Sequence, residues 1–140
     1  MATIDRIFID KNDIEMYKKL DQDDFLAKLE NKDKFMMALS IGFKNKVKRP
    51  LASKEGYALL KYFKIKDIAL MQSIALFEKN DPELLKDEET VYKISEEYAH
   101  AGIKILIDKI ETPGFSDFWK LFEKELFESY IPIEKKDSDK

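Results

Sequence analysis

The chain has 140 residues, about the length of one domain, with 44% hydrophobic and 38% charged residues and a net charge of −3. The hydrophobic share is enough for a core, so we expect a folded domain. Cysteine is absent, which excludes disulfides, thiolate zinc sites and cysteine nucleophiles. No apolar run reaches the ~18 residues of a membrane span and the first ten residues lack a secretory signal pattern, so we expect a cytoplasmic protein without a membrane partner.

Charge is distributed unevenly along the chain. Residues 1–66 carry 15 Lys and Arg against 10 Asp and Glu, whereas residues 67–140 carry 10 against 18. Such asymmetry is typical of a chain with one half facing nucleic acid and the other facing solvent or a protein partner. The alternative is a lysine-rich solvated surface, since arginine, the stronger reader of phosphate and guanine, occurs only at Arg6 and Arg49.

The first 46 residues predict a strand, a short helix and a strongly apolar helix. Residues 4–10 alternate with period two, and residues 12–20 place apolar side chains at helical spacing. Asn31 is expected to cap a second helix, and the centre of that helix, residues 35–43, is apolar on all sides. A helix of that composition is buried on every side, which in so short a chain favours burial in a homodimer.

The middle of the chain predicts a basic loop and one short extra strand. Residues 47–56 contain Pro50 and Gly56, which interrupt regular structure. The aromatic segment 57–63 predicts a short edge or hairpin strand, with a helix as the alternative. Residues 47–66 are therefore expected to link the apolar helix to the second half of the chain.

The second half predicts helices. An apolar helix spans about residues 66–79, an Asp-Pro pair then begins a short helix, and the longest helix spans residues 88–111. Gly102 in the longest helix is expected to allow close approach of another helix. A last amphipathic helix is expected to follow Ser116.

Together these elements predict a mainly α fold of the α+β class. A ribbon-helix-helix-like strand, helix and helix at the N-terminus would precede a small helical bundle with one short extra strand. In a ribbon-helix-helix domain two chains pair their strands into an antiparallel ribbon that enters the DNA major groove. The alternative is that residues 4–10 pair with residues 57–63 of the same chain. Phe8, on the same face as Arg6, favours this alternative because a groove-facing phenylalanine is unusual.

We expect one domain over residues 1–133 and a short disordered tail. Residues 1–46 would form the dimerisation part, residues 47–66 the basic loop and short strand, and residues 67–133 the helical part. Residues 134–140 contain no apolar side chain to bury, so the entropy lost on ordering them would not be offset.

The chemistry-bearing residues do not form a catalytic pattern. His100 is the only histidine, and it lies on a core-type helix, so we interpret it as a packed or surface residue. No GxSxG or Walker pattern is present. Glu88, Glu89, Glu96 and Glu97 share one helix, but 28 acidic residues produce such clusters by chance. We therefore predict no catalytic residue, no metal site and no cofactor, and expect that the protein is not an enzyme.

The basic residues of the first half are the candidate nucleic-acid-binding residues. Arg6 would project from the ribbon, and Lys32 lies at the start of the apolar helix, where a phosphate could bind. The loop contributes five more: Lys44, Lys46, Lys48, Arg49 and Lys54. Duplex DNA is the partner that this set favours. The alternative is a protein-binding adaptor or regulatory subunit that uses the acidic helical half and makes no DNA contact.

Two stretches carry a family resemblance. The first is Lys34–Lys46 followed by Arg49-Pro50-Leu51, and the second runs from Ile74 through an Asp-Pro-Glu turn to the Glu-Tyr-Ala-His-Ala-Gly pattern at residues 97–102. Together they resemble the Dnd system-associated protein 4 family over about residues 5–107, with a departure at His100, where a small polar residue, commonly Asn, is expected. The helix at residues 115–129 would lie outside the shared region. The resemblance implies a bacterial or archaeal cytoplasmic setting, a link to DNA phosphorothioation and phage defence, and other defence-system proteins as partners. It implies no catalytic residue.

Overall fold

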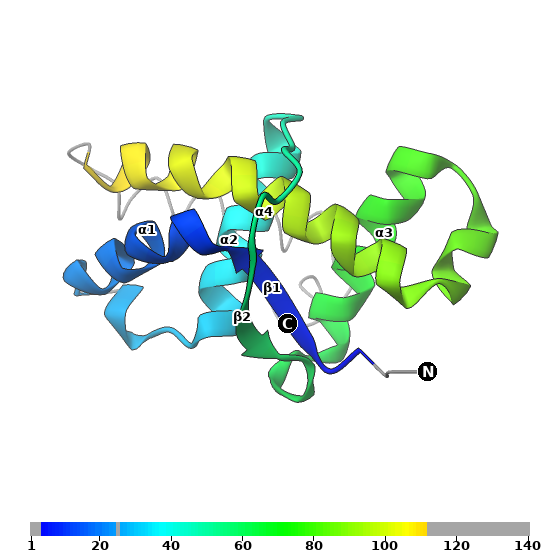
Figure 1. The fold of residues 1–140 in the computed structure, drawn as a ribbon, viewed down its shortest axis with the longest axis horizontal. Helices are drawn as coiled ribbons and strands as arrows, with labels where there is room; N and C mark the ends of the chain where they lie inside the picture. The colour runs from blue at the N-terminus through cyan, green and yellow to red at the C-terminus, as the bar shows by residue number, and fades with distance from the viewer. Residues whose placement is uncertain (1–3, 25, 112–140) are drawn as a thin grey trace, which may run out of the picture. The chain divides into compact units, whose positions relative to one another are not determined.

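The computed structural model describes residues 4–24 and 26–111 (Figure 1). Its helices and strands, in chain order, are β1 (Arg6–Asp10), α1 (Ile14–Lys19), α2 (Asn31–Lys44), β2 (Lys54–Leu59), α3 (Ile65–Lys79) and α4 (Glu88–Ile110). Short 3-10 turns connect several of them. By its contacts the chain divides into two units, Met1–Asp108 and Lys109–Lys140, and the elements described here belong to the first, apart from the last two residues of α4. The predicted fold class is confirmed: a strand, helix and helix precede a helical second half, with one short extra strand.

The two strands pair within the chain as an antiparallel sheet. Arg6 lies opposite Leu59 and Asp10 lies opposite Lys54, with an irregularity between Ile7 and Phe8. One further backbone group of β1 has a partner on α4, because the N–H of Phe8 donates to the Glu96 carboxylate at 2.9 Å. The intrachain alternative is therefore the one that this fold adopts, since β1 has its partner strand within the chain.

Segment 57–63 is strand in one part and a turn in the other. Its first three residues complete β2, and residues Leu60–Tyr62 form a 3-10 turn that leads into α3. The strand prediction is thus correct at the start of this segment only.

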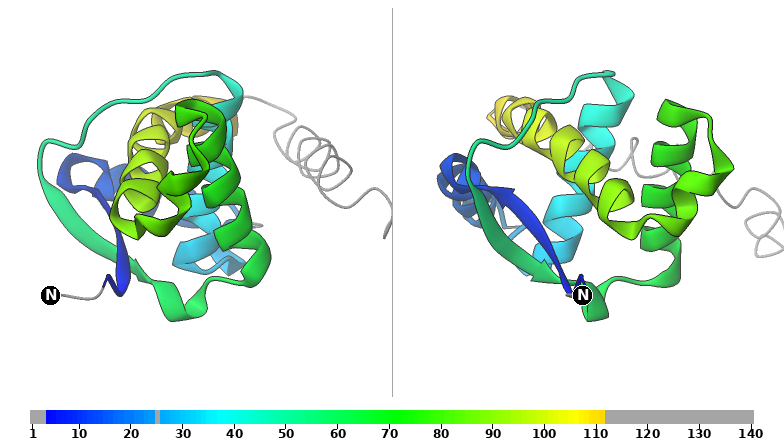
Figure 2. Two further views of the ribbon diagram at one scale, coloured as in Figure 1. Left: turned by 90° about the vertical axis from the view of Figure 1, so that its right-hand side faces the viewer. Right: turned by 45° about the vertical axis from the view of Figure 1, so that its right-hand side comes forward.

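Helix α2 occupies the centre of the first unit, and its own chain buries it. Its residues from Phe35 to Gly42 are all buried. The Phe43 ring contacts Phe77 of α3 and Tyr98 of α4, in both cases with ring centroids 5.5 Å apart. Figure 2 shows α4 crossing α2 on one side and α3 lying beside both helices. The apolar character of α2 therefore reflects a central position in one chain and does not require a second chain.

The crossing of α2 and α4 is close because glycine occupies both helices there. A Cβ atom on Gly102 would lie 1.8 Å from the carbonyl oxygen of Ala38, and one on Gly42 would lie 2.1 Å from that of Tyr98. Neither position can hold a larger residue at this separation of the helix axes. The close approach expected at Gly102 is confirmed.

The second-half helices follow their sequence signals. Helix α3 begins one residue before the predicted boundary, and α4 ends one residue before it. Asp81 accepts a hydrogen bond from the amide of Glu83 at 3.1 Å and so begins a 3-10 helix, Pro82–Lys86, rather than an α-helix. Among the described residues, no helix is both long and apolar enough to cross a membrane. The predicted helix after Ser116 and the predicted tail 134–140 lie outside the described residues.

Candidate nucleic-acid interface

The segment between α2 and β2, residues 45–53, is here named the connector. Figure 1 shows it passing in front of α4 on its way to β2. Backbone hydrogen bonds hold it at three points: Val47 N–H to Gly42 carbonyl (3.0 Å), Arg49 N–H to Glu97 carbonyl (3.1 Å), and Lys11 N–H to Ser53 carbonyl (2.7 Å). The connector is therefore a strap with a defined path over α4, although its sequence predicts only a loop.

Asp10, the last residue of β1, fixes the far end of the connector. One carboxylate oxygen accepts from the amide of Asn12 at 2.8 Å, and the other accepts from the amide of Ala52 at 2.7 Å. Burial acts to raise the pKa of Asp10, but these hydrogen bonds and the nearby His100 outweigh burial and lower it. Asp10 is thus an ionised, buried carboxylate that joins β1 to the connector.

His100 on α4 also contacts this end of the connector's support. We name Asp10, Asp13 and His100 together the anchor. Its Nδ1 lies 2.6 Å from Oδ2 of Asp13, and its Nε2 lies 3.7 Å from Oδ2 of Asp10. Burial raises the pKa of Asp13, and this effect exceeds the opposing effect of the hydrogen bond with His100. His100 is packed, one of the two placements that the sequence left open, and its side chain lies between two buried carboxylates that the sequence did not identify.

The anchor has the composition of a catalytic or metal site without the geometry of one. Among residues 4–24 and 26–111, no three His, Asp or Glu side chains are placed so that they could hold a metal ion. The His100 side chain is only 10% exposed, and Asp10 and Asp13 are less exposed still. The arrangement therefore positions the connector and gives no access to a substrate.

Three predicted residues on or beside the connector carry exposed cationic groups: Lys46, Arg49 and Lys54. None of the three forms an ion pair with another described residue, although the Lys54 ammonium lies 5.7 Å from the centroid of the Phe8 ring. Asp10 and Glu96 are buried, Glu97 at the crossing is partly buried, and Glu55, next to Lys54 on β2, is exposed. The outer surface of the connector is therefore positively charged.

Helix α4 adds two lysines that sequence reasoning missed. Lys93 lies one turn before Glu97, and Lys104 lies two turns after it, so all three share a helix face. The connector crosses α4 at Glu97, and both lysines are exposed. We name the set Lys46, Arg49, Lys54, Lys93 and Lys104 the basic strip. The helical spacing of Lys93 and Lys104 was readable from the sequence, but the crossing point of the connector was not.

Lys48 has a different position from its neighbours on the connector. Its ammonium pairs with Glu78 of α3 at 2.6 Å and lies 3.9 Å from Glu97 of α4. Tyr98 donates its hydroxyl to the same Glu78 carboxylate at 3.1 Å, and burial, together with the Glu78 charge, raises the pKa of Tyr98 to about 12. Lys48 therefore ties the connector to α3 and α4. Lys44 is exposed in the last turn of α2.

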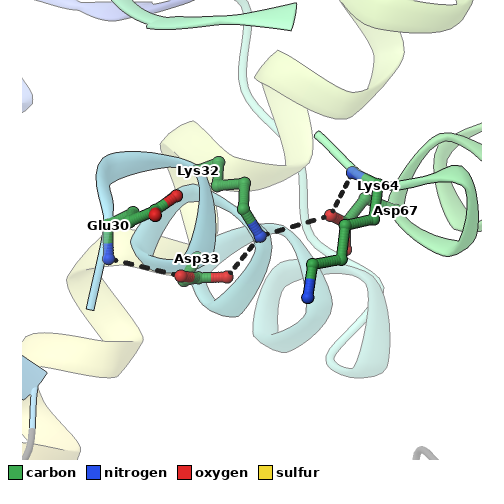
Figure 3. A network of polar contacts seen from close by, with 5 residues as sticks. All are labelled: Glu30, Lys32, Asp33, Lys64 and Asp67. Atoms are coloured by element: carbon green, nitrogen blue, oxygen red, sulfur yellow. Dashed lines mark hydrogen bonds and ion pairs between the residues drawn. The ribbon is translucent and has the colours of Figure 1, made fainter. Parts of the chain in front are cut away.

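Lys32 and Arg6, the remaining predicted residues, lie away from the connector. The Lys32 side chain is buried between Asp33, at 2.9 Å, and Asp67, at 3.6 Å (Figure 3). Burial acts to lower the pKa of Lys32, but the hydrogen bond with Asp33 and the surrounding carboxylates raise it overall. Arg6, at the opposite end of β1 from Asp10, pairs with Asp5 at 2.9 Å.

The two aspartates around Lys32 also begin two helices. Asp33 accepts from the amide of Glu30 at 3.2 Å, and Asp67 accepts from the amide of Lys64 at 2.9 Å (Figure 3). These are the hydrogen bonds that satisfy free N–H groups at the starts of α2 and α3. Lys32 thus links two helix N-termini, which is a structural role that its position in the sequence did not indicate.

The family model of DNA sulphur modification system-associated protein 4 matches residues 6–128. This match agrees with the resemblance carried by the two sequence stretches, and it extends further than expected, because it includes most of segment 115–129. No curated protein and no solved structure matches the chain. Because the match covers most of the 140 residues, the chain belongs to the family of DNA sulphur modification system-associated protein 4.

Proposed function

We propose that this protein is a non-enzymatic accessory protein that binds duplex DNA through the basic strip. The family is associated with a DNA sulphur modification system, which makes DNA the natural partner for a positively charged surface. The observation that carries the proposal is the connector itself. It is held across α4 by backbone hydrogen bonds, with Lys46, Arg49 and Lys54 exposed and with Asp10 and Glu96 buried.

The geometry of the basic strip suits phosphate contacts better than base reading. The cations lie along the connector, at the start of β2 and on one face of α4. Contacts of this kind position a protein on DNA and carry no sequence information. Because the anchor at Asp10 holds the connector in place beforehand, little ordering entropy is lost on binding. We therefore propose binding that depends on salt and is insensitive to sequence.

A second copy of the chain is not needed for this surface. The predicted homodimer rested on an unpaired strand and a helix apolar on all sides, and both are satisfied within one chain. A dimer would have to use another surface, so the homodimer stays a prediction. Native mass measurement with and without duplex DNA counts the copies in each state. The proposed setting is the bacterial or archaeal cytoplasm, where the modified DNA resides, in a phage-defence system.

A protein partner is the second candidate, and exposed apolar side chains on α3 favour it. Ile65 is 89% exposed and Phe77 is 70% exposed. Exposed groups of this size are common at protein interfaces. Other proteins of the DNA sulphur modification system are the proposed partners, with this chain acting as an adaptor or regulatory subunit. Co-purification with those proteins, compared between the parent and Ile65→Ser, tests this candidate.

Salt-dependent binding to duplex DNA tests the first candidate. Replacing Lys46, Arg49 and Lys54 by Ala is expected to weaken binding equally for duplexes of different sequence. The slope of log K against log salt should flatten by about 0.9 for each lost phosphate contact. Replacing Lys19, Lys28 and Lys79 by Ala makes the same change in charge at other exposed positions and is the matched control. Equal effects of the two triple variants would remove the basic strip from the interface, and absence of binding by the parent would favour the adaptor.

A further inference from the structure

A hollow of about 440 Å³ lies where β2, the turn after it and the start of α2 meet. Tyr57 of β2 and Tyr62 of the turn line it, together with Glu30, Asn31 and Lys32 at the start of α2. This volume falls in the range of sites that bind small organic groups. The hollow is separate from the basic strip, with which it shares no residue.

Two tyrosines give the hollow one fixed and one exposed aromatic ring. The Tyr57 ring packs against Tyr17 with centroids 4.6 Å apart, and the Asn31 side chain donates to the Tyr57 carbonyl at 3.0 Å. Tyr57 is therefore held in place. Tyr62 is 57% exposed, and the Lys61 ammonium lies 5.2 Å from its ring centroid. The Lys61 ammonium lies over one face of the Tyr62 ring, so a planar group would stack on the other face.

The charges inside the hollow disfavour an anion. The Lys32 ammonium is directed to Asp33 and Asp67, as Figure 3 shows, so its charge is already neutralised. The lining also includes the carboxyl-bearing Glu30. A phosphate inside would therefore gain no net cation and would lie near a carboxylate. A neutral planar group meets neither obstacle.

The cations near the hollow are exposed. Lys61 and Lys64 flank Tyr62 in the chain, and neither forms an ion pair with another residue in the described ranges. In Figure 3 no contact joins the Lys64 ammonium to the other four residues drawn. The hollow thus offers aromatic surface without net positive charge, which suits a neutral ring. The exposed positive charge lies beside the hollow, where it suits phosphate.

We propose that this hollow binds one unstacked nucleobase of single-stranded or locally opened DNA. The base stacks on Tyr62, and the phosphates on either side of it contact Lys61 and Lys64. This inference rests on the proposed DNA binding and goes beyond it, because the basic strip contacts only the backbone of a duplex. An aromatic platform of this kind accepts any base, since every base has a π face.

Binding of labelled oligonucleotides to the full chain tests the proposal. Fluorescence anisotropy would compare a single-stranded homopolymer with a duplex of equal length for the parent, Tyr62→Ala, Tyr62→Phe and Phe77→Ala. Tyr62→Ala is expected to weaken single-strand binding by roughly tenfold to a hundredfold, the loss of one stacked base, and to leave duplex binding unchanged. Tyr62→Phe keeps the ring and should bind like the parent. Phe77→Ala removes another exposed aromatic ring and is the matched control.

Each other outcome overturns the base-binding site. Unchanged single-strand affinity in Tyr62→Ala, or equal losses for single strand and duplex, would show that the ring does not stack a base. Duplex binding by a parent that does not bind the single strand would overturn the site and leave the proposed function intact. If the parent bound neither, both proposals would fail. Tyr62 is exposed, so Tyr62→Ala should melt at the parent's temperature, which thermal unfolding checks.

Discussion

The Nδ1 atom of His100, in the middle of α4, lies 2.6 Å from the Asp13 carboxylate, 87 residues earlier in the chain. This contact joins the turn after β1 to the helix that the connector crosses. Asp10, which faces the other ring nitrogen of His100, accepts the amide of Ala52 from the connector. A single imidazole thus links β1, α4 and the connector, which carries proposed DNA-binding residues.

Removing this imidazole should loosen the connector. His100→Ala would leave Asp13 buried without its partner, and we expect the free energy of unfolding to fall by about 1–3 kcal/mol. Amide exchange at Arg49 and Ala52 should also accelerate, because the anchor of their segment is weakened. Urea unfolding and hydrogen exchange measure the two effects. Lys104→Ala, an exposed position on the same helix, is the control; equal stability of His100→Ala and this control would contradict the assignment.

Glu96 should make stability depend on pH near neutrality. Burial raises the pKa of its carboxyl from 4.5 to about 7. The folded state therefore binds more protons than the unfolded state between these two values, so the unfolding free energy falls as the pH rises through this window. A pKa shift of this size corresponds to a change in the unfolding free energy of roughly 3 kcal/mol at most.

The variant Glu96→Gln tests this dependence. Glutamine keeps an oxygen that can accept the Phe8 amide but cannot ionise, so the loss of stability between about pH 5 and pH 8 should become smaller. Thermal unfolding across that range measures it. Glu89→Gln makes the same substitution at an exposed position on α4 and should retain the parent profile. A parent whose stability rises through this range would show that Glu96 does not control it.

Gly102 should be intolerant of a single methyl group. In Gly102→Ala the new Cβ would lie 1.8 Å from the carbonyl oxygen of Ala38, so α2 and α4 would have to separate. We expect a loss of about 3 kcal/mol or complete unfolding. Gly56→Ala is the control, because its Cβ would lie 3.1 Å from Cδ of the flexible Arg6 side chain. Circular dichroism melting compares the two, and a Gly102→Ala protein as stable as Gly56→Ala would exclude the close crossing.

Lys32 should affect stability and not DNA binding. Lys32→Gln would leave Asp33 and Asp67 near each other without the ammonium between them, and we expect destabilisation of about 2 kcal/mol. Lys64→Gln changes an exposed side chain whose backbone amide, rather than its ammonium, contacts Asp67, so it should cost little. Urea unfolding gives both values. A salt slope for DNA binding that changed in folded Lys32→Gln would return Lys32 to the interface.

Local patterns in the sequence were enough to predict the long helices of the second half and to identify the family. Apolar spacing and capping residues placed α3 and α4 within one residue of their observed bounds, since helix boundaries depend on groups a few positions apart. The single glycine in α4 likewise indicated where another helix comes close. Two sequence stretches were enough to identify the family, because family membership is a property of sequence.

The tertiary structure alone decided which groups meet. The sequence showed that β1 needs a partner strand and that α2 must be buried, but hydrophobic patterns do not distinguish burial by the same chain from burial by a second copy. Lys32 and Lys48 looked like exposed cations because one carboxylate partner of each, Asp67 for Lys32 and Glu78 for Lys48, lies on α3, tens of residues away. The same distance in sequence concealed the partners of His100. Charge and spacing in the sequence show which charged group a residue carries. Whether that group is free to contact a partner depends on long-range packing.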